Sequence, residues 1–120
     1  MKAVIIGCGA IGSHIAFSLY EYGFEVCVIA RENTYNAINK KGLNIQVNEN
    51  KKILLKKNIQ ISKNFKIYKS INSLKEENID YLFIAVKLKN YNQKLIKSIN
   101  KKIDRNTAVI PPCTNIPSWW

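Results

Sequence analysis

The sequence has few of the residues that build disulfide-bonded or metal-bound domains. It contains three Cys and one His in 120 residues, and no two Cys form a Cys-x-x-Cys pair. An odd number of Cys favours a reducing compartment, and a single His together with the lack of a Cys pair argues against a structural zinc site. Gly (5) and Pro (3) are rare, while 47% of the residues are hydrophobic. This composition excludes disordered and collagen-like chains, and the length predicts one domain with one core.

Long apolar runs are also missing. No stretch approaches the roughly 20 apolar residues that a membrane helix needs. The apolar run 3–11 follows Met1 and Lys2, but too few residues precede Cys8 for a signal peptide or a lipoprotein signal. We therefore expect a cytoplasmic protein without a membrane partner.

Acidic residues are scarce, with 8 Asp+Glu against 19 Lys+Arg and a net charge of +11. A nucleic-acid-binding protein usually gathers such charge on one face, often among aromatic residues. Here the Lys pairs are scattered, only two of the cations are Arg, and an A/T-rich genome would produce the same excess of Lys, Asn and Ile. We expect a solvated Lys-rich surface and no nucleic-acid partner. Salt-dependent affinity for RNA or DNA would support the opposite hypothesis.

Apolar runs rich in β-branched residues are typical of strands buried on both faces of a sheet, and they occur at residues 2–6, 25–29 and 80–86. A further strand is expected at 107–110, before two Pro. Strand, helix and strand within about 30 residues predict a parallel β-α-β unit with a right-handed crossover. The expected fold class is α/β, with a parallel sheet and helices on both faces.

Apolar residues at helical spacing predict two amphipathic helices, one ended by Gly23 and one in the last third of the chain. Residues 32–41 form a weaker helix closed by Gly42, and the alternation in 43–47 predicts a half-exposed strand. Residues 48–67 suggest short strands or a hairpin, and 71–78 a short helix. The two helical stripes are Ile11, Ile15, Leu19 and Tyr22, and Tyr91, Leu95, Ile99 and Ile103.

The clearest motif is a glycine turn with the pattern G-x-G-x-x-G, which follows a predicted strand and opens a predicted helix. Gly7 would permit the tight turn, Gly9 would let a diphosphate approach the backbone, and Gly12 would let the helix lie close to the strand. Amides at the helix start would hold the diphosphate. A tight turn without a ligand is the alternative. The candidate cofactor-binding residues are Gly7, Cys8, Gly9, Ala10, Ile11 and Gly12.

Arg31 directly follows the second predicted strand, 19 residues after Gly12. NAD-binding proteins usually place Asp or Glu there to bind the ribose 2′-hydroxyl. A guanidinium attracts a 2′-phosphate that an acid would repel, so Arg31 predicts NADP(H) rather than NAD(H). Glu32 keeps the alternative open, because its carboxylate can bind the 2′-hydroxyl of NAD.

Three further residues are weaker candidates. Cys8 stands near a helix start that would lower the pKa of its thiol, but the favoured role for this residue is a small filler of the turn. His14 lies at a polar step of the first helix, which is more typical of a solvent-facing than of a catalytic residue. Lys87 follows a buried strand at the edge where open α/β sheets bind ligands, although it could equally be one more surface Lys.

Taken together, these segments resemble the N-terminal domain of the ketopantoate reductase (2-dehydropantoate 2-reductase) family. The resemblance implies a Rossmann-type fold and the NADPH-dependent reduction of a 2-oxo acid, 2-dehydropantoate, to (R)-pantoate in pantothenate and coenzyme A biosynthesis. It follows the family's order over nearly the whole chain, through Gly7-Cys8-Gly9-Ala10-Ile11-Gly12-Ser13, Val28-Ile29-Ala30-Arg31, Gly42-Leu43-Asn44-Ile45, Ile84-Ala85-Val86-Lys87 and, loosely, Ile116-Pro117.

The resemblance also implies roles for single residues. The family's phosphate-binding glycines correspond to the three glycines of the turn, its 2′-phosphate Arg to Arg31, and its Lys beside the nicotinamide to Lys87. Its Asn-Gly pair after the last strand corresponds to Thr114 and Asn115. This departure at the nicotinamide end is what a paralogue with another substrate would show.

The family's helical C-terminal domain, which supplies the general-acid Lys and substrate-binding groups, has no counterpart here. We expect residues 1–120 to be one dinucleotide-binding domain, truncated at its C-terminal end. It would contain no catalytic residue and would bind cofactor with little or no turnover. Unless the end is frayed, a second copy or a separate C-terminal domain should cover Trp119 and Trp120. A stand-alone nucleotide-sensing module without catalysis is the alternative function.

Overall fold

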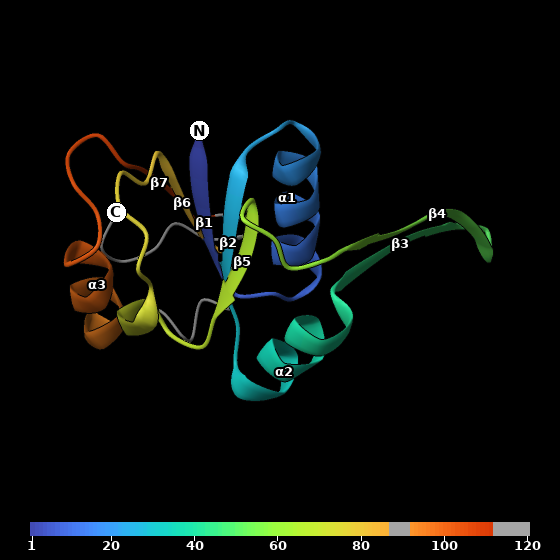
Figure 1. Cartoon of the computed structure of the whole chain (residues 1–120), viewed down its shortest axis with the longest axis horizontal. Helices are drawn as coiled ribbons and strands as arrows, with labels where there is room; N and C mark the ends of the chain where they lie inside the picture. The colour runs from blue at the N-terminus through green and yellow to red at the C-terminus, as the bar shows by residue number, and fades with distance from the viewer. Residues whose placement is uncertain (87–91, 112–120) are drawn as a thin grey trace.

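The computed structural model describes residues 1–86 and 92–111, and its centre is a five-stranded sheet (Figure 1). All neighbouring strands are parallel, and their order is β5-β2-β1-β6-β7. Strands added on both sides of a central β1 are the signature of a doubly wound α/β fold. The strands are β1 Lys2–Ile6, β2 Glu25–Ile29, β5 Phe65–Tyr68, β6 Tyr81–Ile84 and β7 Ala108–Ile110.

The first two strands and the two helices that follow them confirm the predicted elements. Helix α1 (Ala10–Glu21) connects β1 to β2, which run parallel with Lys2 opposite Glu25. Helix α2 (Glu32–Lys41) begins directly after Arg31 and ends at Gly42, whose φ of 82° favours glycine. The expected β-α-β unit is therefore present.

One face of the sheet is covered by α1 and α2. Its buried side chains include Ile5, Val28 and Phe65, which pack with Ala16 of α1 and Ile38 of α2. Burying an Ile or Val side chain stabilises the fold by about 1.5–3 kcal/mol, so this layer fixes both helices against the strands.

The opposite face packs against α3 (Gln93–Asn100) and the segment before β6. Val4, Cys27 and Leu82 point to this side and contact a cluster that includes Leu74 and Ile99. Successive residues of β1 thus enter different cores, because side chains alternate along a strand. Both faces are covered, which is why these strands appear as uninterrupted apolar runs in the sequence.

A separate antiparallel hairpin extends away from the sheet (Figure 1). It consists of β3 (Leu43–Glu49) and β4 (Lys52–Ile59), and at its tip Asn50 and Lys51 both have positive φ, as a type I′ turn requires. Leu43 and its partner Ile59 lie buried at the base of the hairpin. This finding confirms the half-exposed strand at 43–47 and the short strands expected in 48–67. The hairpin, however, pairs β4 with β3, and β5 joins the main sheet beside β2.

The helix expected at 71–78 is wrong. Only a single 3-10 turn forms (Ile71–Ser73), and Ser70 and Ser73 cap it reciprocally. From Leu74 the chain becomes extended and directs Glu76 toward lysines of the sheet. Those ion pairs are long-range contacts that override the weak local preference for a helix.

The helical stripes need smaller corrections. In α1, Ile11 is 58% exposed and Tyr22 lies beyond the helix and is 85% exposed, whereas Gly12 and Ala16 are buried. Helix α3 ends before Ile103, although Ile103 still packs on the core, and Tyr91 lies outside the described residues. In the described part of the chain, every helix is too short or too polar to cross a membrane.

Candidate functional site

A cavity of about 670 Å³ opens at the carboxyl ends of the parallel strands. It lies where the strand order reverses between β1 and β6, the position at which open α/β sheets bind ligands. Among the described residues that line it, none is acidic and two are cationic. The lining residues, which we call the cleft, are Ile6, Gly7, Cys8, Gly9, Ile29, Ala30, Arg31, Thr34, Lys69, Ala85 and Val86.

The bend from β1 into α1 depends on two glycines. Gly7 has a φ of 99°, and its N–H donates to the Ile29 carbonyl oxygen (2.8 Å). A Cβ added to Gly7 would lie only 2.6 Å from the Ala85 carbonyl oxygen. A Cβ on Gly12 would overlap the Gly7 carbonyl oxygen. Both positions therefore exclude side chains, and Gly12 lets α1 approach the turn as the sequence predicted.

Gly9 is different, because nothing described lies within 4 Å of where its Cβ would be. It occupies the N-cap of α1, where no side chain caps the helix, and the first turn contains no acidic residue. The amides of a first helical turn have no partner within the helix, and the helix dipole makes this end positive. The open space at Gly9 is thus bordered by hydrogen-bond donors suited to an anion.

Cys8 lines the same turn but lacks the features of a reactive thiol. Its Sγ lies 3.3 Å from Ser13 Oγ. Burial raises the pKa of Cys8, and the hydrogen bond with Ser13 only partly opposes this effect. The expected lowering of its pKa by the helix start is wrong, and Cys8 acts as a small filler of the turn.

Arg31 follows β2 and forms the N-cap of α2, with its side chain exposed in the cleft. Thr34, in the first turn of α2, and Lys69, directly after β5, line the same cavity. The Lys69 Nζ lies 5.2 Å from the centroid of the Tyr35 ring, within the range of a cation–π contact. Within residues 1–86 and 92–111, neither Arg31 nor Lys69 forms an ion pair.

The remaining predicted site residues are placed less centrally. Ala10 and Ile11 are exposed at the start of α1 and do not line the cavity, while Gly12 lies buried behind the turn. His14 is exposed on α1. The predicted nicotinamide-side residues Lys87, Thr114 and Asn115 lie outside the described residues.

Sequence inspection missed Thr34 and Lys69. Lys69 follows a short strand in the stretch with the weakest pattern, and nothing local shows that this strand pairs with β2. The pairing places Tyr68 beside Ile29, so that the residues after both strands meet at one edge. The sequence signal that could have indicated this role is a Lys directly after the alternating apolar and polar residues 65–68, which are typical of a strand.

A second cavity of about 420 Å³ adjoins the cleft on the α3 side of the sheet. It shares Ile6, Ile29, Arg31 and Val86 with the cleft, so one edge of β1 and β2 borders both. Its other lining residues mix apolar and neutral polar side chains with one cation: Ser70, Ile71, Asn72, Asn92, Lys94, Leu95 and Ser98.

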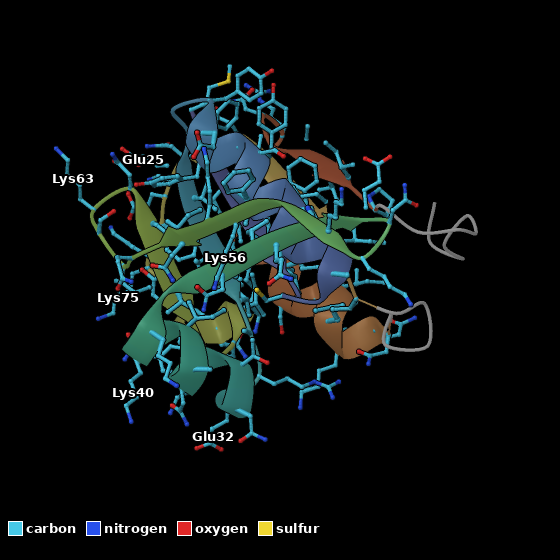
Figure 2. All side chains as sticks on the ribbon, turned by 90° about the vertical axis from the view of Figure 1, so that its right-hand side faces the viewer. Glu25, Glu32, Lys40, Lys56, Lys63 and Lys75 are labelled. Atoms are coloured by element: carbon cyan, nitrogen blue, oxygen red, sulfur yellow. The ribbon has the colours of Figure 1, made fainter. Side chains whose placement is uncertain are left out.

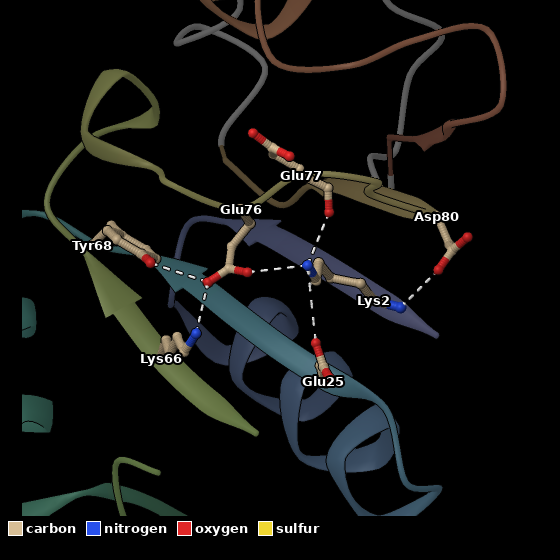
Figure 3. Close-up of polar contacts among 7 residues, drawn as sticks. All are labelled: Lys2, Glu25, Lys66, Tyr68, Glu76, Glu77 and Asp80. Atoms are coloured by element: carbon tan, nitrogen blue, oxygen red, sulfur yellow. Dashed lines mark hydrogen bonds and ion pairs between the residues drawn. The ribbon is translucent and has the colours of Figure 1, made fainter. Parts of the chain in front are cut away.

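A polar cluster away from the cleft joins β1, β5 and the irregular segment before β6 (Figure 3). In this Glu76 cluster, which comprises Lys2, Lys66, Tyr68 and Glu76, the carboxylate is 10% exposed. Its Oε2 lies 3.2 Å from Lys2 Nζ, and its Oε1 lies 3.1 Å from Lys66 Nζ and accepts a 3.1 Å hydrogen bond from the Tyr68 hydroxyl. Every charged group of this cluster thus faces an opposite charge.

The cluster also shifts pKa values. Burial acts to raise the pKa of Glu76, but hydrogen bonds from Lys66, Lys2 and Tyr68 outweigh it and hold the pKa below its ordinary value. Burial, followed by the charge of Glu76, raises the pKa of Cys27 to about 12. The Cys27 thiol is therefore neutral and unreactive at physiological pH.

The parallel sheet, its strand order and the glycine turn define a Rossmann-type α/β domain. A family model described as ketopantoate reductase PanE/ApbA matches residues 3–112. The chain therefore belongs to the ketopantoate reductase family. No curated protein sequence matches it.

Solved structures share the fold. A 2-dehydropantoate 2-reductase from Methylococcus capsulatus is 19% identical with a TM-score of 0.72, over 98% of this chain and 35% of that one. D-mandelate dehydrogenase with NADH and anilino(oxo)acetate is 24% identical with a TM-score of 0.71, over 97% and 34%. A PanE/ApbA family ketopantoate reductase from Ralstonia eutropha is 21% identical with a TM-score of 0.66, over 91% and 33%. The chain thus spans about a third of the length of these structures.

Proposed function

We propose that this chain is the NADP(H)-binding part of a 2-oxo acid reductase related to 2-dehydropantoate 2-reductase, with the dinucleotide in the cleft. The observation that carries the proposal is the cavity at the switch point of the sheet, bordered by an open glycine turn and two cations and by no described acidic side chain. Membership of the ketopantoate reductase family supports the assignment.

The diphosphate of the cofactor is assigned to the turn at Gly9. There the missing Cβ leaves open space, and the amides of the first turn of α1 provide donors with the positive end of the helix dipole. Cys8, Ala10 and Ile11 contribute to this position through their backbone, because their side chains are not needed to bind phosphate.

Arg31 is assigned to the ribose 2′-phosphate, which makes NADP(H) the preferred cofactor. Its guanidinium stands exposed at the end of β2 and has no ion pair with a described residue. NADH in the D-mandelate dehydrogenase structure shows that the same fold also holds the cofactor without that phosphate. Glu32, next to Arg31 but outside the lining of the cleft, would favour NAD(H) only if its side chain turned inward.

In the proposed reaction, the nicotinamide supplies a hydride to the carbonyl carbon of a 2-oxo acid. Reduction to the alcohol also requires a proton donor and a closed site. We assign no such donor to the residues of this chain. Lys87, Thr114 and Asn115 are proposed to lie at the nicotinamide end, and pantothenate biosynthesis in the cytoplasm is the proposed setting.

Titration of NADPH and NADH by fluorescence tests the cofactor assignment. We expect tighter binding of NADPH. Arg31→Ala should weaken NADPH binding by about tenfold or more and NADH binding by less than about threefold. Equal or tighter binding of NADH by the unaltered chain would overturn the preference, and loss of both affinities in Arg31→Ala would show that Arg31 does not read the 2′-phosphate.

Gly9→Ala tests the position of the diphosphate. The φ of −81° and the free space allow Ala, so the free energy of unfolding should fall by no more than about 1 kcal/mol, the usual cost of Ala at a helix N-cap. The methyl group would occupy the proposed phosphate position, and both NADPH and NADH should bind about tenfold more weakly or worse. Undiminished affinity in this folded variant would place the dinucleotide elsewhere.

A further inference from the structure

The cleft contains a second exposed cation that the glycine-turn motif does not explain. Lys69 directly follows β5, and β5 pairs in parallel with β2, which Ala30 connects to Arg31. The Ala30 N–H donates to the Tyr68 carbonyl oxygen (3.0 Å), so the pairing continues to the residues that precede Lys69 and Arg31. Two cations are thereby brought to one edge of the same cavity.

Both cations lack a neutralising partner in the described structure. No described carboxylate lies within ion-pair distance of either side chain, and none lines the cavity. Two like charges at one edge repel each other, which is unfavourable unless an anion joins them. The Thr34 hydroxyl, which lines the same cavity, adds a neutral donor there.

Tyr35 limits where the Lys69 side chain can go. The Nζ of Lys69 lies 5.2 Å from the centroid of the Tyr35 ring, which projects from α2 and is half-buried against the core. Tyr35 also donates from its backbone N–H to the Arg31 carbonyl oxygen (2.7 Å) in the first turn of α2. Tyr35 therefore connects the end of β5 to the helix that Arg31 caps, so the Lys69 side chain loses less freedom when an anion binds.

We propose that Lys69 is a second specificity residue of the cleft, which binds the ribose 2′-phosphate together with Arg31. This inference rests on the proposed binding of NADP(H), and it concerns discrimination between the two cofactors only. A phosphate dianion placed between an ammonium and a guanidinium satisfies both charges, whereas the 2′-hydroxyl of NAD(H) satisfies neither.

The test is a set of binding titrations with NADPH, NADH, adenosine 2′,5′-bisphosphate and adenosine 5′-monophosphate. Lys69→Met keeps much of the length of the side chain but removes its charge. We expect affinity for NADPH and for the bisphosphate to fall by about fivefold or more, and affinity for NADH and the monophosphate by less than about twofold. Lys69→Arg, which retains the charge and can still stack on Tyr35, should restore most of the loss.

Lys63→Met is the matched control, because Lys63 is an exposed Lys that precedes the same strand. In Figure 2, Lys63 lies at the upper left edge of the molecule, well away from Glu32, the first residue of α2, at its lower edge. The control loses the same net charge, so any change it shares with Lys69→Met is a general electrostatic effect, and we expect its NADPH affinity to stay within about twofold.

The outcomes separate this inference from the proposed function. If the unaltered chain binds neither dinucleotide, the proposed function fails. If it binds NADPH and Lys69→Met weakens both dinucleotides equally, weakens neither, or only matches Lys63→Met, then Lys69 is not a specificity residue while the proposed function stands. Thermal unfolding of each variant ensures that the comparison is made between folded proteins.

Discussion

The cleft and the Glu76 cluster both bring together cations from two strands of one sheet, but only the Glu76 cluster also supplies a carboxylate. Lys66 and Lys69 stand three residues apart at β5, yet Lys66 ends 3.1 Å from Glu76 whereas Lys69 enters a cavity bordered by no described acid. The paired charges fasten an irregular segment to the sheet. The charges of Arg31 and Lys69 have no ion pair among the described residues, so they remain available to bind an anion such as the proposed cofactor.

The presence or absence of a charged partner predicts whether a substitution changes the stability of the fold or the affinity for a ligand. Removing a charge with a buried, hydrogen-bonded partner leaves that partner unsatisfied and destabilises the fold. Removing an exposed charge without a partner changes stability little and can even relieve repulsion. Substitutions in the Glu76 cluster should therefore change unfolding but not cofactor affinity, and substitutions of Arg31 or Lys69 should do the reverse.

Gly12→Ala should have the largest effect, because it alters both properties. The added methyl group would overlap the Gly7 carbonyl oxygen, and a backbone atom of a tight turn cannot move aside easily. We expect a loss of about 3 kcal/mol in the free energy of unfolding, at the upper end for overpacking, together with loss of dinucleotide binding. Urea unfolding of Gly12→Ala against Gly9→Ala checks this, since Gly9→Ala should remain stable. Equal stability of the two variants would show that the turn can relax.

Glu76→Gln should have the next largest effect, and only on stability. The amide keeps the shape of the side chain but cannot compensate Lys2 and Lys66. We expect a loss of about 2 kcal/mol, reduced by solvent around the half-exposed Lys66, while NADPH affinity stays within about twofold. Urea unfolding and NADPH titration of the same preparation measure both quantities. A variant that unfolds like the unaltered chain but binds NADPH poorly would reverse the proposed division between the two regions.

Much of the fold was predictable because its central strands are buried on both faces. The boundaries of β1, β2 and α2 agree with the sequence prediction, since apolar runs and a closing Gly42 are local features. The helix expected at 71–78 failed for the opposite reason. Glu76 is held by Lys2, which is more than 70 residues away in the chain, and no local pattern encodes that contact.

Only the part of the candidate site that comes from one continuous segment of the chain could be predicted from the sequence. The glycine turn and Arg31 lie within a single β-α-β unit, so their spacing in the sequence already places them together. Lys69 and Thr34 join them through the pairing of β5 with β2 and the packing of α2, which depend on the whole sheet. The exposed Ile11 shows a further limit, because the fully buried residues of α1 are the small Gly12 and Ala16, whereas Ile15 and Leu19 of the predicted stripe are only partly buried against the core.

The smallest predicted effect uses pH to separate the two regions. Hydrogen bonds from Lys66, Lys2 and Tyr68 hold the pKa of Glu76 below its ordinary value despite its burial, so the folded chain binds this proton less readily than the unfolded chain. The stability it contributes is complete above the ordinary pKa of a glutamate, about 4.3, and is lost as the pH falls through the lower pKa of the folded state. The stability difference between the unaltered chain and Glu76→Gln should therefore stay constant well above about pH 4.3 and narrow as the pH falls below it, measured by urea unfolding at each pH. The free energy of unfolding of Lys69→Met should differ from that of the unaltered chain by the same amount at every pH in this range, because no described carboxylate pairs with Lys69. If the stability difference from the unaltered chain stayed constant with pH for Glu76→Gln, or narrowed for Lys69→Met, charge pairing would not distinguish the Glu76 cluster from the cleft.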